Sequence, residues 1–387
     1  MKRLCFVLPV MLLFTIMLFA SFSFAQSHFV YTDDNVNVGN DQSSVNTVSA
    51  FSVAANGSLS LIAGSPFTTG GSGGGNNIDP EEIAIATLPG TSYLYAANDG
   101  SGTIAAFRIN AVTGYLMRVN GSPFMADGAP GGDYSLAVSP NGKFLFATEE
   151  NVTVIHVYSI NPTTGALTEI SSSPFQTGVS NQGLNVTANG KFLIVGEGAA
   201  TAVAVYSIGS NGTLTPVSGS PFAASAAPLN IQSNCAGNLA FVADTTPLID
   251  VYSIGSNGAL TPVPGEPFSN GTQDTNGGLA LSPNNDFLFV SDTFTNDLSS
   301  LAVASDGTLS QGSGSPFSTS NWTGGMAVTK SGKFLYTSLF TVAEVDARAI
   351  DEKGKLAPVP GTPFSTGQSQ TGVPTVITFP PPACPAE

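Results

Sequence analysis

Basic residues are scarce in this sequence. Its 387 residues include 11 Lys and Arg against 26 Asp and Glu, which gives a formal net charge of −15 at pH 7. Proteins that bind nucleic acid place clustered Lys and Arg against the phosphates, so the composition argues against nucleic acid as a partner. The acidity keeps a chain soluble, and it also leaves cation binding as an interpretation.

Cysteine is equally scarce. The chain has three, and because Cys5 falls within an N-terminal leader, Cys235 and Cys384 remain. Two cysteines permit one disulfide in an oxidising compartment but cannot build a disulfide framework. We expect no required bond between them, because in the repeat described below they lie in units three steps apart and only the C-terminal tail could bridge them. The core must therefore stabilise the fold.

Long apolar runs are missing after the first 25 residues. Lys2 and Arg3 precede the apolar run Leu4–Phe19, and small residues lead to Ser23-Phe24-Ala25. This pattern is typical of a secretory signal peptide at 1–25 that is cleaved after Ala25. The run is about 16 residues long, shorter than the roughly 20 that a membrane-spanning helix needs. We expect a secreted or periplasmic protein without a membrane span, a single domain at 26–387, and a mature formal charge of −17, because Lys2 and Arg3 leave with the signal.

Helical periodicity is also missing, and an internal repeat dominates instead. Seven prolines are each followed by phenylalanine, at spacings of 57, 51, 47, 46, 49 and 47 residues, and a glycine stands nine residues before each one. A constant offset in seven copies identifies a repeat architecture. The prolines are Pro66, Pro123, Pro174, Pro221, Pro267, Pro316 and Pro363, and the glycines are Gly57, Gly114, Gly165, Gly212, Gly258, Gly307 and Gly354.

Each repeat contains four short runs rich in β-branched and aromatic residues, separated by turn residues. In one copy these runs are 136–138, 143–147, 154–160 and 167–170. Four strands in 46 to 57 residues is the size of a propeller blade, so we predict an all-β, seven-bladed β-propeller with four-stranded blades. Proline suits the outer edge strand because it cannot donate to a sheet ladder, and we expect the phenylalanine after it to pack between neighbouring blades.

The two ends of the chain predict how the ring closes. The first repeat starts at 28–31 without the innermost strand that every later repeat has, and the run 374–379 is left over after the last Pro-Phe pair. We therefore expect the C-terminal strand to pair into the first blade and close the ring. A closed propeller exposes only short edges, and we expect a monomer.

Several of these runs resemble those of a known family. The second runs at 93–98, 144–149, 192–197 and 287–292, and the turn at 139–143, are similar to the YVTN-type repeats of the seven-bladed propeller lactonases. That family includes the bacterial 6-phosphogluconolactonase type and the fungal muconate-lactonising type. The resemblance covers roughly 28–379, and it implies a propeller fold and lactone hydrolysis.

The resemblance does not supply catalytic residues. Active members of the family place histidines just before the innermost strands and arginines toward the channel, whereas here those strand starts hold Tyr134-Ser135, Gln182-Gly183, Gly277-Gly278 and Gly324-Gly325. The mature chain has two histidines, which lie in or beside apolar runs and which we interpret as structural. The histidines are His28 and His156, and the arginines, in third and fourth strands, are Arg108, Arg118 and Arg348.

One set of polar residues remains as a candidate site. The last residue of the second strand carries a carboxyl or amide group in six of the seven repeats, which would surround one opening of the channel. It is Asp33, Asn98, Glu149, Glu197, Asp244 and Asp292. Three interpretations stay open: hydrogen bonding to backbone N–H groups of their own loops, coordination of Ca²⁺ or another divalent cation, or a carboxyl pair acting as general acid and base.

Two functions are compatible with these features. The first is an extracytoplasmic lactonase-family propeller that hydrolyses a sugar lactone, with no cofactor required. The second is a non-catalytic secreted or cell-surface propeller that binds a carbohydrate or a protein partner on the channel face. Fold likeness alone does not choose between them.

Overall fold

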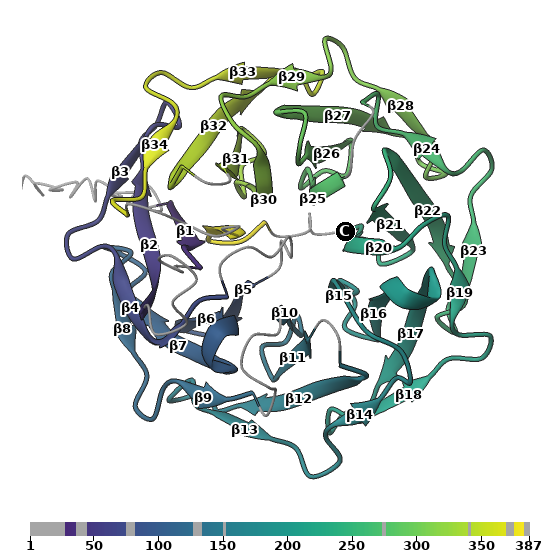
Figure 1. Ribbon diagram of the computed structural model, residues 1–387, viewed down its shortest axis with the longest axis horizontal. Coiled ribbons are helices and arrows are strands. Elements are labelled where there is room, and N and C mark those ends of the chain that lie inside the picture. The colour runs from purple at the N-terminus through teal and green to yellow at the C-terminus, as the bar shows by residue number, and fades with distance from the viewer. Residues whose placement is uncertain are drawn as a thin grey trace, which may run out of the picture.

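The protein forms a ring of seven β-sheets. The computed structural model describes residues 28–35, 45–74, 82–126, 134–149, 152–272, 276–339, 342–368 and 375–382. Figure 1 shows the sheets arranged radially around a central channel, with purple β1 beside a yellow strand from the end of the chain. We number the blades 1 to 7 in chain order.

The two inner positions of every blade are occupied by well-formed antiparallel strands. The innermost strands, from blade 1 to blade 7, are β35 (Thr375–Phe379), β5 (Ile83–Leu88), β10 (Tyr134–Val138), β15 (Leu184–Val186), β20 (Pro228–Ser233), β25 (Asn276–Leu281) and β30 (Thr323–Val328). The second strands are β1 (Phe29–Asp33), β6 (Thr91–Asn98), β11 (Phe144–Glu149), β16 (Phe192–Glu197), β21 (Leu239–Asp244), β26 (Phe287–Asp292) and β31 (Phe334–Leu339).

The third strand of every blade is long, and the fourth is divided into two segments that both pair with the third. The third strands are β2 (Val45–Val53), β7 (Thr103–Ile109), β12 (Val154–Ile160), β17 (Ala202–Ile208), β22 (Leu248–Ile254), β27 (Asp297–Val303) and β32 (Glu344–Ile350). The first outer segments are β3 (Leu59–Leu61), β8 (Leu116–Arg118), β13 (Leu167–Glu169), β18 (Leu214–Pro216), β23 (Leu260–Pro262), β28 (Leu309–Gln311) and β33 (Leu356–Pro358). The second outer segments are β4 (Phe67–Ser72), β9 (Phe124–Met125), β14 (Phe175–Gln176), β19 (Phe222–Ala223), β24 (Phe268–Ser269), β29 (Phe317–Ser318) and β34 (Phe364–Ser365).

Helical structure is minor in the described residues. Two short 3₁₀ turns, η2 (Asp99–Ser101) and η3 (Gly198–Ala200), follow the second strands of blades 2 and 4. No described helix is long and apolar enough to cross a membrane. The predicted signal peptide at 1–25 lies outside the described residues.

The ring closes as the sequence predicts. Strand β35 pairs antiparallel with β1, from Phe29 opposite Phe379 to Asp33 opposite Thr375, so the first and last strands of the propeller share one sheet. The rings of Phe29 and Phe379 stack with centroids 6.5 Å apart. The C-terminal strand is therefore the innermost strand of blade 1.

The Ser-Pro-Phe motif explains why the outer strand is divided. The predicted single edge strand is interrupted at the proline, and the side chain before it takes over one hydrogen bond of the ladder. In six blades this hydroxyl accepts a backbone N–H of the third strand at 2.8 to 3.0 Å. The residues are Ser65, Ser122, Ser173, Ser220, Ser315 and Thr362.

Blade 5 departs from this rule, because Glu266 stands where the other blades have the hydroxyl. Burial, together with a hydrogen bond and charge repulsion from Asp250, raises the pKa of Glu266 from its ordinary 4.5 to about 7. The native state therefore binds more protons than the unfolded chain between these pH values, and stability falls as pH rises through this window. The unfavourable contribution is fully present above pH 7.

Replacing Glu266 with Ser should stabilise the protein at pH 8 by about 1 kcal/mol, with a smaller gain at pH 5. The reason is that the repeat's own hydroxyl replaces a carboxylate that is costly to ionise, and solvent screening limits the size of the effect. Urea unfolding at both pH values measures the difference. Glu266→Gln is the control that removes the charge alone. A Ser variant less stable than the parent at pH 8 would contradict the expectation.

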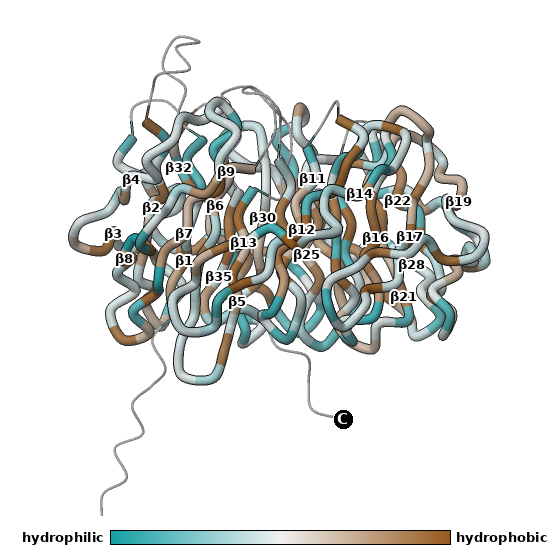
Figure 2. Tube along the Cα trace, turned by 90° about the horizontal axis from the view of Figure 1, so that it is seen from below, coloured by the Kyte–Doolittle hydropathy of each residue, from teal (hydrophilic) through white to brown (hydrophobic). Residues whose placement is uncertain are grey.

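The apolar core lies between the blades. Seven clusters of buried residues appear in the described structure, and each combines side chains of two adjacent blades. The phenylalanine of every Pro-Phe pair packs in one of these clusters, as predicted: Phe67, Phe124, Phe175, Phe222, Phe268, Phe317 and Phe364. Apolar (brown) segments accordingly follow many of the strands in Figure 2.

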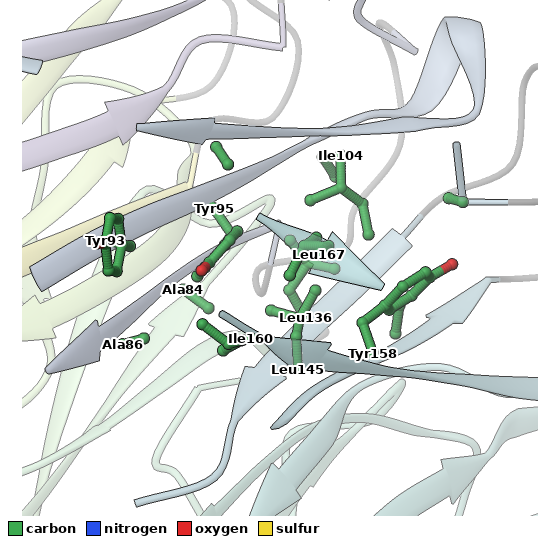
Figure 3. Packing of buried hydrophobic residues seen from close by; sticks show 14 of the residues in the cluster. Ala84, Ala86, Tyr93, Tyr95, Ile104, Leu136, Leu145, Tyr158, Ile160 and Leu167 are labelled. Atoms are coloured by element: carbon green, nitrogen blue, oxygen red, sulfur yellow. The ribbon is translucent and has the colours of Figure 1, made fainter. Parts of the chain in front are cut away.

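The cluster between blades 2 and 3 shows why the repeat needs its glycine. Tyr93 and Tyr95 of blade 2 share this cluster with Leu136, Leu145 and Leu167 of blade 3 (Figure 3). A Cβ on Gly165 would stand 2.3 Å from the Tyr93 ring, and the φ of +76° at Gly165 is one that other residues rarely adopt. The glycine nine residues before each proline thus permits a tight turn against the preceding blade.

The structure corrects the expectation about cysteine, because Cys235 is disulfide-bonded. It follows the innermost strand of blade 5. A mature chain that has lost Cys5 retains one other cysteine, Cys384, which lies outside the described residues. The expectation gave too little weight to the C-terminal tail, because the residues after β35, Pro381 and Pro382, line the same channel cavity as Cys235.

Loss of this disulfide should lower stability. A bond that closes a loop of more than 100 residues restricts the unfolded chain, and native disulfides are commonly worth about 2–4 kcal/mol. We expect Cys235→Ser to lower the melting temperature, and dithiothreitol to do the same to the parent but not to the variant. Intact-mass analysis after alkylation without reductant is the check, and labelling of both mature thiols would contradict it.

Candidate functional site

The central channel holds a cavity of about 370 Å³. Residues from the innermost strands of all seven blades line it, most of them aliphatic. Polar lining groups are concentrated in blades 4 and 5, where Asn185, Asn230, Gln232 and Ser233 contribute amides and a hydroxyl. None of the described lining residues is Lys, Arg, His, Asp or Glu.

The six predicted site residues are each the last residue of a second strand, as expected. All six are buried, with at most 3% of any residue exposed, and none of them lines the channel cavity. They end β1, β6, β11, β16, β21 and β26 as Asp33, Asn98, Glu149, Glu197, Asp244 and Asp292. They stand one strand outside the channel wall, and the structure divides them into two groups.

In blades 5 and 6 the carboxylates bond within or near their own loops. Asp244 Oδ1 accepts the backbone N–H of Thr246 at 2.7 Å, and burial raises the pKa of Asp244 to about 6. Asp292 accepts the hydroxyls of Thr272 at 2.9 Å and Ser299 at 3.0 Å. The Asp244 contact fits the interpretation in which a side chain bonds the backbone of its own loop, whereas Asp292 bonds hydroxyls of the segment after blade 5 and of strand β27. Glu197 of blade 4 precedes η3 without a side-chain bond to the turn, and burial raises its pKa.

In blades 1 and 2 the carboxyls are brought together by asparagine side chains. Asn46 Nδ2 donates to Asp33 Oδ1 at 2.9 Å and to Asn98 Oδ1 at 3.3 Å, which joins two predicted site residues across the blade boundary. Asn35 Nδ2 donates to Glu82 Oε1 at 3.0 Å and to Asp99 Oδ2 at 3.2 Å. We call Asp33, Asp34, Asn35, Asn46, Glu82, Asn98 and Asp99 the acidic cluster.

The acidic cluster continues into blade 3. The backbone N–H of Tyr134 donates to Asp99 Oδ1 at 3.3 Å, and the Tyr134 hydroxyl donates to Glu149 Oε2 at 3.1 Å. Burial raises the pKa of Glu149. Three of the six predicted residues, Asp33, Asn98 and Glu149, thus belong to one connected polar region.

Burial makes ionisation costly in this cluster, and the hydrogen bonds described for its carboxyls come from amides, hydroxyls, backbone N–H groups and other carboxyls. Desolvation raises the pKa of Asp99 to about 7, a rise that a hydrogen bond from Glu82 partly offsets. Burial raises the pKa of Asp34 to about 7 although three hydroxyls bond it. Burial and the charge of Asp99 hold the pKa of Asp33 well above its ordinary value. The Asp33 Oδ2 atom is buried and has no hydrogen-bond partner.

The acidic cluster adjoins the channel cavity through Glu82. Glu82 directly precedes β5, and the next residue, Ile83, lines the cavity. The backbone N–H of Glu82 donates to Thr375 Oγ1 at 3.3 Å, and Thr375 lines the cavity as well. Glu82, which hydrogen-bonds with the Asp99 carboxyl whose pKa is about 7, therefore lies beside a channel of ligand size.

Sequence reasoning found the strand-end residues but missed Asp34, Asn35, Asn46, Glu82 and Asp99. The pairs Asp33-Asp34 and Asn98-Asp99 in the sequence were a usable signal, since each adds a second polar group to a predicted site residue. Among the described residues, no group of three or more His, Cys, Asp and Glu side chains has an arrangement that could hold a metal ion. The cation interpretation remains a prediction for chelation experiments.

The scarce basic side chains lie away from the channel. His156, on β12, is buried and shares a hydrogen bond of 2.9 Å between its Nδ1 and Glu169 Oε1. Arg348 on β32 donates to Asp346 Oδ2 at 2.6 Å and to the Ser318 carbonyl at 2.8 Å. The contact of His156 suits the structural role expected of the histidines.

Comparison with known proteins agrees with this architecture. Residues 42–181 and 185–369 match the family model described as "Lactonase, 7-bladed beta-propeller". The chain belongs to this lactonase family of seven-bladed propellers. No curated protein sequence matches it.

Solved structures with the same fold cover nearly the whole propeller. A protein of Bacteroides fragilis described provisionally as a 6-phosphogluconolactonase has 16% identity and a TM-score of 0.72, over 91% of this chain and 98% of that one. The periplasmic gluconolactonase of Pseudomonas aeruginosa has 16% identity and a TM-score of 0.67, over 91% and 99%. A Lactobacillus plantarum protein has 18% identity and a TM-score of 0.71, also over 91% and 99%. At these identities the likeness establishes the fold.

Proposed function

We propose that this protein hydrolyses a sugar lactone outside the cytoplasm. Membership of the lactonase family supports the reaction class. The signal-like leader at 1–25 supports the location. The observation that carries the proposal is the acidic cluster beside the channel cavity, because burial raises the pKa of carboxyls such as Asp99 toward neutrality next to a ligand-sized space.

The hydrogen-bonded pair Glu82 and Asp99 is the best candidate for acid–base chemistry. Two carboxyls that share a site do not both ionise readily, so one holds a proton while the other accepts one. In hydrolysis the ionised member takes a proton from water as the water oxygen bonds to the lactone carbonyl carbon. When the ring C–O bond breaks, the proton passes to the leaving ring oxygen, which becomes a hydroxyl, and the product is a hydroxy acid.

The test is a pH-stat assay of glucono-1,5-lactone with purified mature protein, since hydrolysis releases acid that titration measures directly. We expect turnover above the spontaneous rate, and the same turnover after treatment with EDTA. No acceleration for any of a panel of five- and six-membered sugar lactones would overturn the proposal. Loss of activity on chelation would instead favour the cation interpretation.

The non-catalytic alternative is favoured by one observation. The strand starts where the family's active members carry histidines hold Tyr134-Ser135, Gln182-Gly183, Gly277-Gly278 and Gly324-Gly325, and no described basic side chain lines the cavity. Under this alternative the channel binds a sugar without converting it. Binding of a sugar lactone without turnover by the same preparation would support it.

A further inference from the structure

The channel wall of blades 4 and 5 carries chemistry that the lactonase assignment leaves unexplained. Strand β20 alternates, so that Asn230 and Gln232 line the cavity while Ile231 is fully buried in the core cluster between blades 4 and 5. Asn185 on β15 and Ser233 on β20 line the same cavity. We call Asn185, Asn230, Gln232 and Ser233 the amide wall.

The amide wall is a built feature, because the two strands that carry it approach each other closely. A Cβ on Gly183 would stand 2.2 Å from the Leu229 carbonyl oxygen, so only glycine fits between β15 and β20 there. Within this contact the Ser233 hydroxyl donates to Asn185 Oδ1 at 2.7 Å, across the blade boundary. The hydrogen bond fixes the orientation of the Asn185 amide in the channel.

Asn230 is the member that points to a ligand. It is 2% exposed, and its Oδ1 is buried without a hydrogen-bond partner. Buried amide oxygens in folded proteins are almost always bonded, so an exception on a residue that lines a cavity favours a donor from outside the chain, which the oxygen reaches when the amide group rotates. A hydroxyl group is such a donor.

The remainder of the cavity sets the other properties of the ligand. Ile83, Ile85, Val376 and Ile377 line the channel in blades 1 and 2, which makes the surface there mostly apolar. A cavity of about 370 Å³ with mostly apolar lining and a few polar groups suits a small ring compound. The polar side chains present are amides and hydroxyls, which are neutral, and outside the amide wall they include Ser282, Asn285 and Thr375.

The described cavity lining has no charged side chain, and this disfavours anionic ligands. A phosphate or carboxylate group taken into a low-dielectric channel needs Arg, Lys or several N–H donors to offset its lost hydration. Here no described lining residue is basic, and Arg348 is held by Asp346 on the third strand of blade 7.

We infer that the amide wall binds an uncharged, hydroxyl-bearing ring ligand and discriminates against phosphorylated or carboxylate-bearing ones, with Asn230 as the principal specificity-determining residue. Identification of this ligand as a cyclic ester rests on the proposed function. The ligand class then follows from the wall: a neutral sugar lactone and not a sugar-phosphate lactone.

Binding can be tested without turnover. The probes are gluconolactam, a neutral ring analogue that is not hydrolysed by ester chemistry, and its 6-phosphate, each titrated into mature protein by isothermal calorimetry. We expect the lactam to bind at least 10-fold more tightly than its phosphate. Equal or tighter binding of the phosphate, or failure of the lactam to bind, would overturn the inference with no variant required.

Variants of the amide wall test which residues bind the lactam. Asn230→Leu, which keeps the shape but removes hydrogen bonding, should weaken lactam binding at least 10-fold, while Gln176→Leu on the exposed outer edge of blade 3 should leave it unchanged. If Asn230→Leu fails to fold, Gln232→Leu is the second variant, with a 3-fold or greater loss expected. Undiminished binding in a folded wall variant would contradict the assignment.

The outcomes separate this inference from the proposed function. Lactam binding that depends on Asn230, without hydrolysis of any lactone, would uphold the amide wall and refute catalysis. Hydrolysis that prefers a 6-phosphorylated lactone and is unaffected by Asn230→Leu would uphold catalysis and refute the amide wall.

Discussion

A chain truncated before Val373 should lose about 10 °C or more in melting temperature and should aggregate. Truncation removes β35, which supplies the innermost strand of blade 1 and pairs along the whole length of β1. All five residues of β1 are buried in the intact ring, and Val376 and Phe379 belong to two inter-blade core clusters. Without β35 the edge of β1 and both clusters face solvent, and an unpaired apolar edge promotes association.

The matched control ends the chain after Pro382. It keeps β35 but removes Cys384, so it separates the contribution of the strand from that of the disulfide at Cys235. We expect this control to behave like Cys235→Ser. Light scattering and thermal unfolding of the two truncated chains provide the measurement. Equal melting temperatures for the parent and the chain lacking β35 would contradict closure by this strand.

The sequence predicts those features of the fold that recur in every repeat. The Pro-Phe pairs and their glycines recur seven times, so one physical requirement, a turn packed against the preceding blade, is visible as a pattern. The divided edge strand was not predicted, because the role of the serine before proline depends on a backbone N–H about 15 residues away, as for Ser65 and Ala50.

The candidate site was predictable only where it follows the repeat. Asp33 and Asn98 stand at a repeated position, and reading along the repeat was enough to find them. Asn35 and Glu82 are 47 residues apart, and Asn46 is 52 residues from Asn98, so their contacts depend on how two blades meet. Residues that occur once in seven blades leave no periodic signal, and such exceptions are where function is expected.

Replacing Asp99 with Asn should lower the activity of the protein and raise its stability. Loss of one member of a carboxyl pair removes its proton transfer, and general acid–base groups typically contribute 10²–10⁴-fold, so we expect lactone turnover to fall by about 100-fold or more. Glu82→Gln should have an effect of similar size. Asp306→Asn, on an exposed turn between the third and fourth strands of blade 6, is the control and should leave turnover unchanged.

Stability should change with pH in the opposite direction to that of an ordinary surface aspartate. The pKa of Asp99 rises from 3.8 in the unfolded chain to about 7 in the folded one, so the native state holds an extra proton between these values. The stability that protonated Asp99 contributes at low pH is therefore lost as pH rises through about 7. Asp99→Asn mimics the protonated form, and we expect it to be more stable than the parent by about 2 kcal/mol at pH 8 and nearly equal to it at pH 4.

Thermal unfolding of the parent and Asp99→Asn at pH 4 and pH 8, beside pH-stat turnover at pH 8, measures both effects on the same preparations. An inactive variant that is more stable at pH 8 identifies a carboxyl retained for chemistry at the expense of stability, as active sites commonly are. An active variant with the same stability gain would mean that the cluster serves only the junction of blades 1 and 2. A variant less stable at pH 8, or a parent whose melting temperature falls with EDTA, would show that the ionised cluster is stabilised by a bound cation, in place of acid–base catalysis.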